Sequence, residues 1–165
     1  ILLFSSAGKS IRFKESDGRS VGRTAIGVRG IRLADKDKVV SLIVAESDDP
    51  ILTATEKGYG KRTQLDEYRA QARGGSGVIS IKTSDRNGQV VGAIQVTDED
   101  EMMLISDKGT LVRARAADVS IIGRNTQGVT LINIADDEAL VSVAKIAETD
   151  DDEEGTDEIE VTSEE

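Results

Sequence analysis

The sequence predicts an all-β protein made of three repeats of about fifty residues, each with the strand content of a propeller-type blade. Polar and apolar residues alternate with a period of two rather than 3.6, as in 10–14 and 129–134. Turn dipeptides such as Asp17-Gly18 and Lys57-Gly58 separate these short segments. The same features then recur at offsets of 50 or 51 residues, which is the signature of a repeat architecture.

Five features keep register in all three repeats. A glycine follows an apolar run, an arginine stands four residues later, and a Gly-Val pair comes 19 residues after that glycine. A second arginine precedes the Gly-Val pair by four residues, and a closing apolar segment ends each unit. The first glycines are Gly8, Gly58 and Gly109, the first arginines Arg12, Arg62 and Arg113, the glycines of the Gly-Val pairs Gly27, Gly77 and Gly128, and the second arginines Arg23, Arg73 and Arg124.

The repeats divide the chain into blades at 1–50, 51–102 and 103–147, followed by a tail at 148–165. The tail holds 11 acidic residues and no basic one, so the net charge of −10 belongs to it, and residues 1–147 carry 20 acidic and 21 basic residues. Such a polyanion buries no apolar surface and repels itself, which predicts disorder. It either keeps the protein soluble or competes for a basic surface on the blades.

Composition excludes several chemistries. The chain has no His and no Cys, so it holds no disulfide, no His or Cys zinc site and no Ser-His or Cys-His nucleophile. No run of 18 apolar residues is present, and the opening Ile1-Leu2-Leu3-Phe4, with no basic residues before it, is not expected to be a signal peptide. The start at Ile1, inside a strand pattern and without Met, favours a part of a longer chain.

Local signals add three expectations. Asn87-Gly88 predicts a type I′ hairpin between Lys82 and Val90. Helical spacing occurs only around 63–72 and is short and polar. Because three repeats form an open array, an end repeat is expected to expose apolar surface or an unpaired strand edge.

Four segments of the repeats resemble the C-terminal domain of the DNA gyrase A protein. The similarity extends from residue 1 to about 147, and its clearest motifs are 27–33, 58–63, 109–113 and 123–129. The resemblance implies a β-pinwheel, usually of six four-stranded blades, of which three would be about half. The topoisomerase IV subunit shares this fold and is the nearest alternative, and a protein-interaction propeller is another.

The resemblance implies a function in DNA wrapping. In this family the domain wraps double-stranded DNA around a positive rim and so supports ATP-dependent negative supercoiling by a type II topoisomerase. The implied partners are the upstream part of gyrase A and the gyrase B protein, in a bacterial cytoplasmic heterotetramer. The fragment itself would be non-catalytic and without a cofactor, since ATP and Mg belong to the holoenzyme.

The family's signature box, Gln-basic-Arg-Gly-Gly-basic-Gly, has a degenerate counterpart in the second repeat. Ala72 and Ser76 replace two of its basic residues, so wrapping initiation is not assigned to it. The matching positions are Gln71, Arg73, Gly74, Gly75 and Gly77.

Sequence-independent DNA binding needs cations spaced along a surface. The register-matched arginines would supply two rings of them, and glycines beside Arg73 and Arg124 would let phosphates reach backbone N–H groups. The alternative is that these arginines cap the interfaces between blades by pairing with Asp or Glu. No catalytic or metal-ligating residue is predicted, and Tyr68 is assigned to packing or a surface contact. The candidate DNA-binding residues are Arg12, Arg23, Arg29, Arg32, Lys61, Arg62, Arg69, Arg73, Arg113, Arg115 and Arg124.

Overall fold

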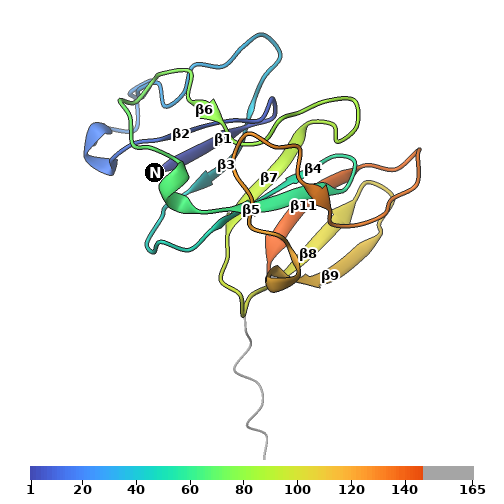
Figure 1. Cartoon of the computed structure of the whole chain (residues 1–165). Coiled ribbons are helices and arrows are strands. Elements are labelled where there is room, and N and C mark those ends of the chain that lie inside the picture. The colour runs from blue at the N-terminus through green and yellow to red at the C-terminus, as the bar shows by residue number, and fades with distance from the viewer. Residues whose placement is uncertain (147–165) are drawn as a thin grey trace, which may run out of the picture.

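The computed structural model describes residues 1–146, so the predicted acidic tail lies outside the described residues. Three antiparallel sheets are arranged side by side (Figure 1). The described residues contain no α-helix, only three single-turn 3-10 helices. The all-β prediction is therefore confirmed.

Each repeat contributes a three-stranded antiparallel core to one sheet. In each, the first strand lies between the other two, and the first two strands are joined by a tight turn at a glycine with positive φ. The strands are β1 (Leu2–Ser5), β2 (Lys9–Arg12) and β3 (Val39–Ile43), then β4 (Ile51–Thr55), β5 (Tyr59–Thr63) and β7 (Val90–Gln95), then β8 (Glu101–Ser106), β9 (Leu111–Arg115) and β11 (Leu140–Lys145).

The fourth strand of a sheet comes from the following repeat. β6 (Val78–Ile79), in the second repeat, pairs with β2 of the first, and β10 (Val129–Thr130), in the third, pairs with β5 of the second. The first two sheets thus have four strands, and the third has three within the described residues. The third repeat itself contributes four strands, β8 to β11, but its β10 joins the second sheet, and no later repeat among residues 1–146 adds a fourth strand to the third sheet.

This exchange also overturns the hairpin expected at Asn87-Gly88. β6 and β7 belong to different sheets, and Gly88 has positive φ whereas Asn87 does not, so the turn is not type I′. The side chain of Asn87 is buried instead, and its Nδ2 donates to the carbonyl oxygens of Lys82 and Gln127 at 2.8 and 3.0 Å. Asn87 therefore fastens its loop to the third repeat.

The apolar core lies between the sheets. Leu2 and Phe4 of β1 pack with Ile51 of β4 and with Tyr68, whose ring meets Phe4 edge-on at a centroid distance of 5.7 Å. A second cluster joins β4 to β8 through Leu52 and its neighbours. Each sheet therefore depends on the next for burial, as in other repeat proteins. The burial of Tyr68, 1% exposed, confirms its assignment to packing.

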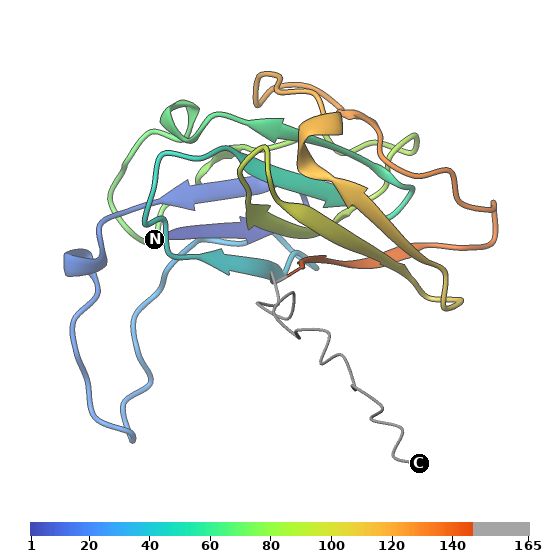
Figure 2. The same cartoon turned by 90° about the horizontal axis from the view of Figure 1, so that it is seen from below.

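Short 3-10 helices follow the second strand of each repeat. They are η1 (Glu15–Asp17), η2 (Leu65–Glu67) and η3 (Ala116–Asp118), and η2 is all that forms where helical spacing was noted at 63–72. In the first repeat, the segment between η1 and β3 forms a long loop that projects away from the sheets (Figure 2). It is the largest departure from the compact arrangement of the other two repeats.

Candidate nucleic-acid interface

The first set of register-matched arginines joins neighbouring repeats. Nη1 of Arg12 donates to the carbonyl oxygens of Leu65 and Tyr68 at 3.1 and 3.3 Å. Nε of Arg62 donates to the carbonyl oxygen of Val119 at 2.8 Å, and Val119 is the counterpart of Tyr68 one repeat later. These contacts agree with the alternative in that the arginines connect blades, but the partners are backbone carbonyl oxygens, and of these two arginines only Arg62 also pairs with an acidic residue, Asp98.

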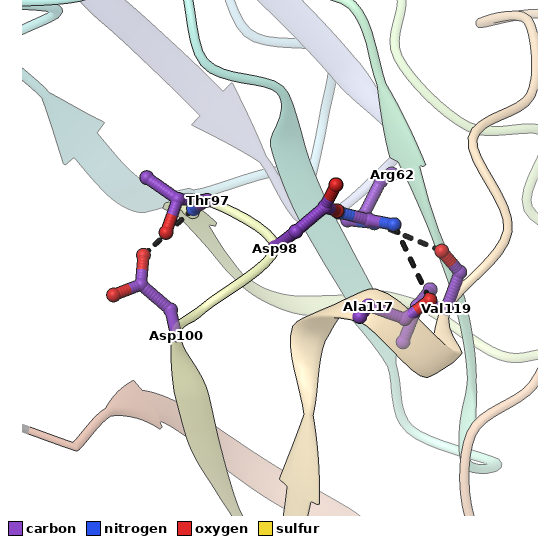
Figure 3. A network of polar contacts seen from close by, with 6 residues as sticks. All are labelled: Arg62, Thr97, Asp98, Asp100, Ala117 and Val119. Carbon is purple, nitrogen blue, oxygen red and sulfur yellow. Dashed lines mark hydrogen bonds and ion pairs between the residues drawn. The ribbon is translucent and has the colours of Figure 1, made fainter.

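The buried side chain of Arg62 is the centre of a polar network that extends to the exposed Asp98 (Figure 3). Arg62 is 4% exposed, its guanidinium forms an ion pair with Asp98, and Nη2 lies 3.5 Å from the carbonyl oxygen of Ala117. On the same connection, Asp100 accepts from the Thr97 N–H at 2.7 Å. Burial raises the pKa of Asp100, but hydrogen bonds from Lys145 and Thr97 outweigh this and leave the pKa below its usual value.

The second set of arginines follows the same principle. Arg73 donates from Nη1 to the carbonyl oxygen of Arg29 and from Nε to that of Asp17, and Arg124 donates from Nη1 to that of Ile79 at 2.8 Å. Arg29 and Ile79 are equivalent positions one repeat apart. Each of these arginines therefore contacts the equivalent residue of the repeat that precedes its own.

Lys61 is entirely buried. Its Nζ donates to the carbonyl oxygens of Gly123 and Arg124, both at 2.6 Å, and to Oγ1 of Thr126 at 3.0 Å. Burial lowers the pKa of Lys61 to about 8, although Glu67 nearby raises it. Because Lys61 and Arg62 are enclosed by the third repeat, the structure argues against direct phosphate contacts by these two predicted residues.

The box-like loop of the second repeat packs against the first. The N–H of Gln71 donates to the carbonyl oxygen of Arg12 at 2.9 Å, and that of Gly74 to the carbonyl oxygen of Gly30 at 2.7 Å. The Gly74 N–H is thus engaged within the protein rather than free for a phosphate. Arg124 is similar, since its N–H donates to Oε2 of Glu67 at 3.0 Å.

Three of the predicted cations remain exposed, two on the segment 29–32 and one just before the loop 71–77. The segment 29–32 lies beside the loop 71–77, because the Arg32 N–H donates to the carbonyl oxygen of Gly75 at 2.8 Å. The side chains of Arg29, Arg32 and Arg69 are exposed, and no hydrogen bond or ion pair engages them within residues 1–146. We call these three residues the exposed arginine group.

The remaining predicted cations lie elsewhere. Arg113 and Arg115 project from β9, where they form exposed ion pairs with Glu101 and Asp118. Arg23 is exposed in the long loop of the first repeat. The predicted residues therefore form no single cluster: Lys61 and four arginines serve mainly as joints between repeats, and the other six are exposed in the first repeat, at Arg69 and on β9.

Sequence reasoning missed the basic character of the long loop itself. Residues 14–38 contain seven basic and four acidic residues, and only Arg23, Arg29 and Arg32 were predicted to bind DNA. The local count of cations identifies the others, whereas repetition in register does not, because they have no equivalents in the other repeats. The additional exposed cations are Lys14, Arg19, Lys36 and Lys38.

Two other kinds of feature, a metal site and a membrane-spanning helix, were sought among the described residues. In the part of the chain that the structure describes, no group of three or more acidic side chains is placed to hold a metal ion. No helix among those residues is long and apolar enough to cross a membrane. The surface carries exposed arginines on loops that the sheets hold in place. Arginines placed in this way can contact phosphates without reading the base sequence.

The family model for the DNA gyrase C-terminal domain, described as a β-propeller, matches residues 1–46, 49–97 and 100–147. The chain belongs to this family. It is 60% identical over 154 residues to the DNA gyrase A protein of Klebsiella oxytoca and 57% identical over 153 residues to that of Escherichia coli K12. The matches cover 93% of this chain but only 18% of each relative.

Solved structures agree with the sequence matches. A DNA gyrase A C-terminal domain superposes with a TM-score of 0.83 and 31% identity, over 88% of this chain and 50% of that one. The C-terminal domain of DNA topoisomerase IV gives 0.81 and 25%, over 88% and 46%. The resemblance to gyrase is confirmed, and the topoisomerase IV alternative fits less well because the curated relatives at 57–60% identity are gyrase A proteins.

Proposed function

We propose that this chain is a non-catalytic DNA-binding and DNA-wrapping module of the DNA gyrase A protein. The observation that carries the proposal is family membership over the whole described chain, together with exposed arginines on loops between rigid sheets. Contacts to phosphates from such a surface give affinity without sequence preference, and the bending of the duplex supplies what selectivity there is.

The proposal places the DNA on the exposed arginine group and the basic loop of the first repeat. Arg12, Arg62, Arg73 and Arg124 then act indirectly, because they fix the angle between successive sheets. In this arrangement the repeated arginines shape the surface and the non-repeated ones contact the phosphates. Charge reversal at Arg12 or Arg62 would therefore disturb the fold as well as DNA binding.

The wider role that we propose extends the family resemblance. The module would act in a bacterial cytoplasmic assembly with the rest of gyrase A and with the gyrase B protein, where ATP-driven strand passage introduces negative supercoils. The proposed blades remain 1–50, 51–102 and 103–147. The acidic segment 148–165 would lower the affinity for DNA if it occupies the same basic surface.

The test measures binding of the 165-residue chain to a fluorescent duplex of about 40 base pairs over a salt series. We expect binding at low salt and a linear fall of log K with log salt, with a slope of about −0.9 for each phosphate contacted. Nicked plasmid ligated in the presence of the chain should also change its linking number if DNA is wrapped. An affinity that does not depend on salt would contradict DNA binding, and unchanged linking number with normal binding would contradict wrapping.

A further inference from the structure

Lys82 occupies the same place between the second and third repeats that Arg32 occupies between the first and second. We call the contact between two successive repeats a joint. At the first joint the Arg32 N–H donates to the carbonyl oxygen of Gly75 at 2.8 Å. At the second joint the Lys82 N–H donates to the carbonyl oxygen of Thr126, also at 2.8 Å. The side chain of Lys82 is exposed like that of Arg32, and no hydrogen bond or ion pair engages it within residues 1–146.

Arg86 stands on the same loop as Lys82 and is oriented by two other residues. Its Cζ lies 4.9 Å from the centroid of the Tyr59 ring, and its Nη1 donates to Oε1 of Gln127 at 3.4 Å. Tyr59 begins β5, and Gln127 shortly precedes β10, which pairs with β5. A cation over an aromatic face is attracted by the quadrupole of the ring. The guanidinium is therefore held in one orientation by residues of two repeats.

The loop that carries Arg86 is fastened on both sides. The side chain of Asn87 is buried, and its Nδ2 donates to the carbonyl oxygen of Gln127 in the third repeat at 3.0 Å. Nζ of Lys57, on the hairpin turn between β4 and β5, donates to the carbonyl oxygen of Asp85. Because Arg86 lies between these two anchored positions, its backbone is fixed relative to both repeats.

The charge of Arg86 is not neutralised by an ion pair among the described residues. Arg86 borders a hollow of about 510 Å³ between the second and third repeats, which is also lined by acidic side chains. Four of these carboxylates have other partners: Glu56 binds the Gln89 N–H, Asp107 the Ala139 N–H, Asp137 the Lys108 ammonium and Glu138 the Ser106 hydroxyl. Nε and Nη2 of Arg86 have no partner in residues 1–146 and can donate to a phosphate.

The repeat shows how far this row of cations extends. Two equivalent positions, four residues apart, carry cations in the first and second repeats and none in the third. An acidic side chain at the second of these positions repels phosphate, so the row ends at the second joint. The residues at the two positions are Arg32 and Lys36 in the first repeat, Lys82 and Arg86 in the second, and Asn133 and Asp137 in the third.

We propose that Lys82 and Arg86 form a phosphate site for duplex DNA at the second joint, which continues the exposed arginine group from the first. The inference rests on the proposed function and adds two contacts to it. Arg86 supplies a planar fork of donors, and Lys82 supplies a point charge on a flexible stem. Tyr59 is a positioning residue, because a guanidinium that is already oriented loses less side-chain freedom when it binds.

The first experiment removes the charge of Arg86 in the 165-residue chain and measures binding to the fluorescent duplex over a salt series. We expect Arg86→Gln to reduce the slope of log K against log salt by about 0.9, so that the ratio of affinities at about 50 and 200 mM salt falls about threefold. Lys108→Gln is the matched control, because it removes one exposed cation from the neighbouring hairpin turn, where it pairs with Asp137. Its slope should stay close to that of the parent chain.

The outcomes of this experiment separate the site from the proposed function. If the parent chain binds with the expected salt dependence and Arg86→Gln has the same slope, the site is overturned and the proposed function stands. If Lys108→Gln lowers the slope as much as Arg86→Gln, the effect is one of total charge, which also overturns the site. A parent chain without salt-dependent binding overturns both.

The second experiment tests the role of the Tyr59 ring with the charge of Arg86 kept. Tyr59→Leu removes the aromatic face and should lower DNA affinity about twofold to tenfold, which is the effect of one more side chain to be ordered on binding. Tyr59→Phe keeps the ring and should bind like the parent chain. Melting curves of both variants check that the fold is retained.

The same substitution in the Arg86→Gln background decides whether the ring acts through Arg86. Two residues that act through one contact are not additive, so Tyr59→Leu should have no further effect on affinity when Arg86 is absent. A loss of the same size in both backgrounds would mean that the ring acts through the fold of β5, and the positioning role would be overturned. Equal affinities of Tyr59→Leu and Tyr59→Phe in the parent background would overturn it as well.

Discussion

Nε of Arg62 donates to the carbonyl oxygen of Val119 at 2.8 Å, across 57 residues of chain. Arg12 makes the corresponding contact to Tyr68 one repeat earlier. An arginine recurs every fifty residues because each joint needs a donor long enough to span two sheets and charged enough to replace the hydration that burial removes. The joint, rather than a ligand, accounts for the periodicity of these residues.

Replacing Arg62 with Met should lower the free energy of unfolding by about 2–3 kcal/mol. The change removes charge-assisted hydrogen bonds and leaves the buried Val119 carbonyl without this donor. Urea unfolding followed by circular dichroism measures the loss. The matched control is Arg113→Met, whose exposed ion pair should contribute less than about 1 kcal/mol. If Arg113→Met lowers the free energy of unfolding as much as Arg62→Met does, the contact of Arg62 with the Val119 carbonyl does not hold the two repeats together as described.

The repeat and its strands could be predicted from the sequence because both are local patterns. Alternation of period two marks 10–14 as a strand, and glycine positions mark the turns. The offset of 50 or 51 residues then fixes equivalent positions without any knowledge of tertiary structure. The family motifs added the name of the fold, which periodicity alone does not distinguish from other propeller-type arrays.

The exchange of strands between repeats could not be predicted from the sequence alone. An offset places Val78 at the same point of its repeat as Val129 but does not say which sheet either joins. The expected hairpin at Asn87-Gly88 failed for that reason. Likewise Arg12 and Arg62 are as repetitive as a phosphate track would be, and only their carbonyl partners show what they hold.

Stability should depend on pH through Lys61. The pKa of Lys61 is lowered from 10.5 to about 8 in the folded protein, so between these values the unfolded chain binds the proton that the folded protein has released. The free energy of unfolding therefore rises with pH in this window, by about 2 kcal/mol between about pH 8 and 9.5. Measurements stop there because burial raises the pKa of Tyr68, which reverses the trend above about pH 10.

The Lys61→Met variant isolates this contribution. Urea midpoints between about pH 7 and 9.5 should rise in the parent chain and become nearly flat in the variant. Lys108→Met, at an exposed ion pair with Asp137, serves as the control and should keep the parent's rise. If Lys61→Met keeps the full slope, the titrating group is another residue.

DNA affinity should depend on the exposed arginine group more than on the paired arginines. Changing Arg29, Arg32 and Arg69 together to Gln should reduce the salt slope of log K by up to about 2.7, which is about 0.9 for each phosphate that is no longer neutralised. Fluorescence anisotropy with the same duplex measures this, and melting curves check that the fold is intact. Arg115→Gln, which removes one exposed cation already paired with Asp118, should change the slope by less than about 0.9. Equal slopes for the triple variant and the parent would place the DNA elsewhere.

The effect on stability of the close approach between the backbones of Gly128 and Gly60 can be measured by comparison with Gly27. Gly27 is the equivalent residue of the first repeat, and a Cβ there would meet nothing within 4 Å. Gly128→Ala and Gly27→Ala carry the same strain, since the φ values are +82° and +86°. Only at residue 128 would the new Cβ also lie 2.6 Å from a carbonyl oxygen, that of Gly60. Urea unfolding should show a loss of about 1 kcal/mol for Gly27→Ala and at least about 2 kcal/mol more for Gly128→Ala. Equal losses would mean that β10 moves away from β5 at no cost, and the joint would then contribute little to holding the repeats together.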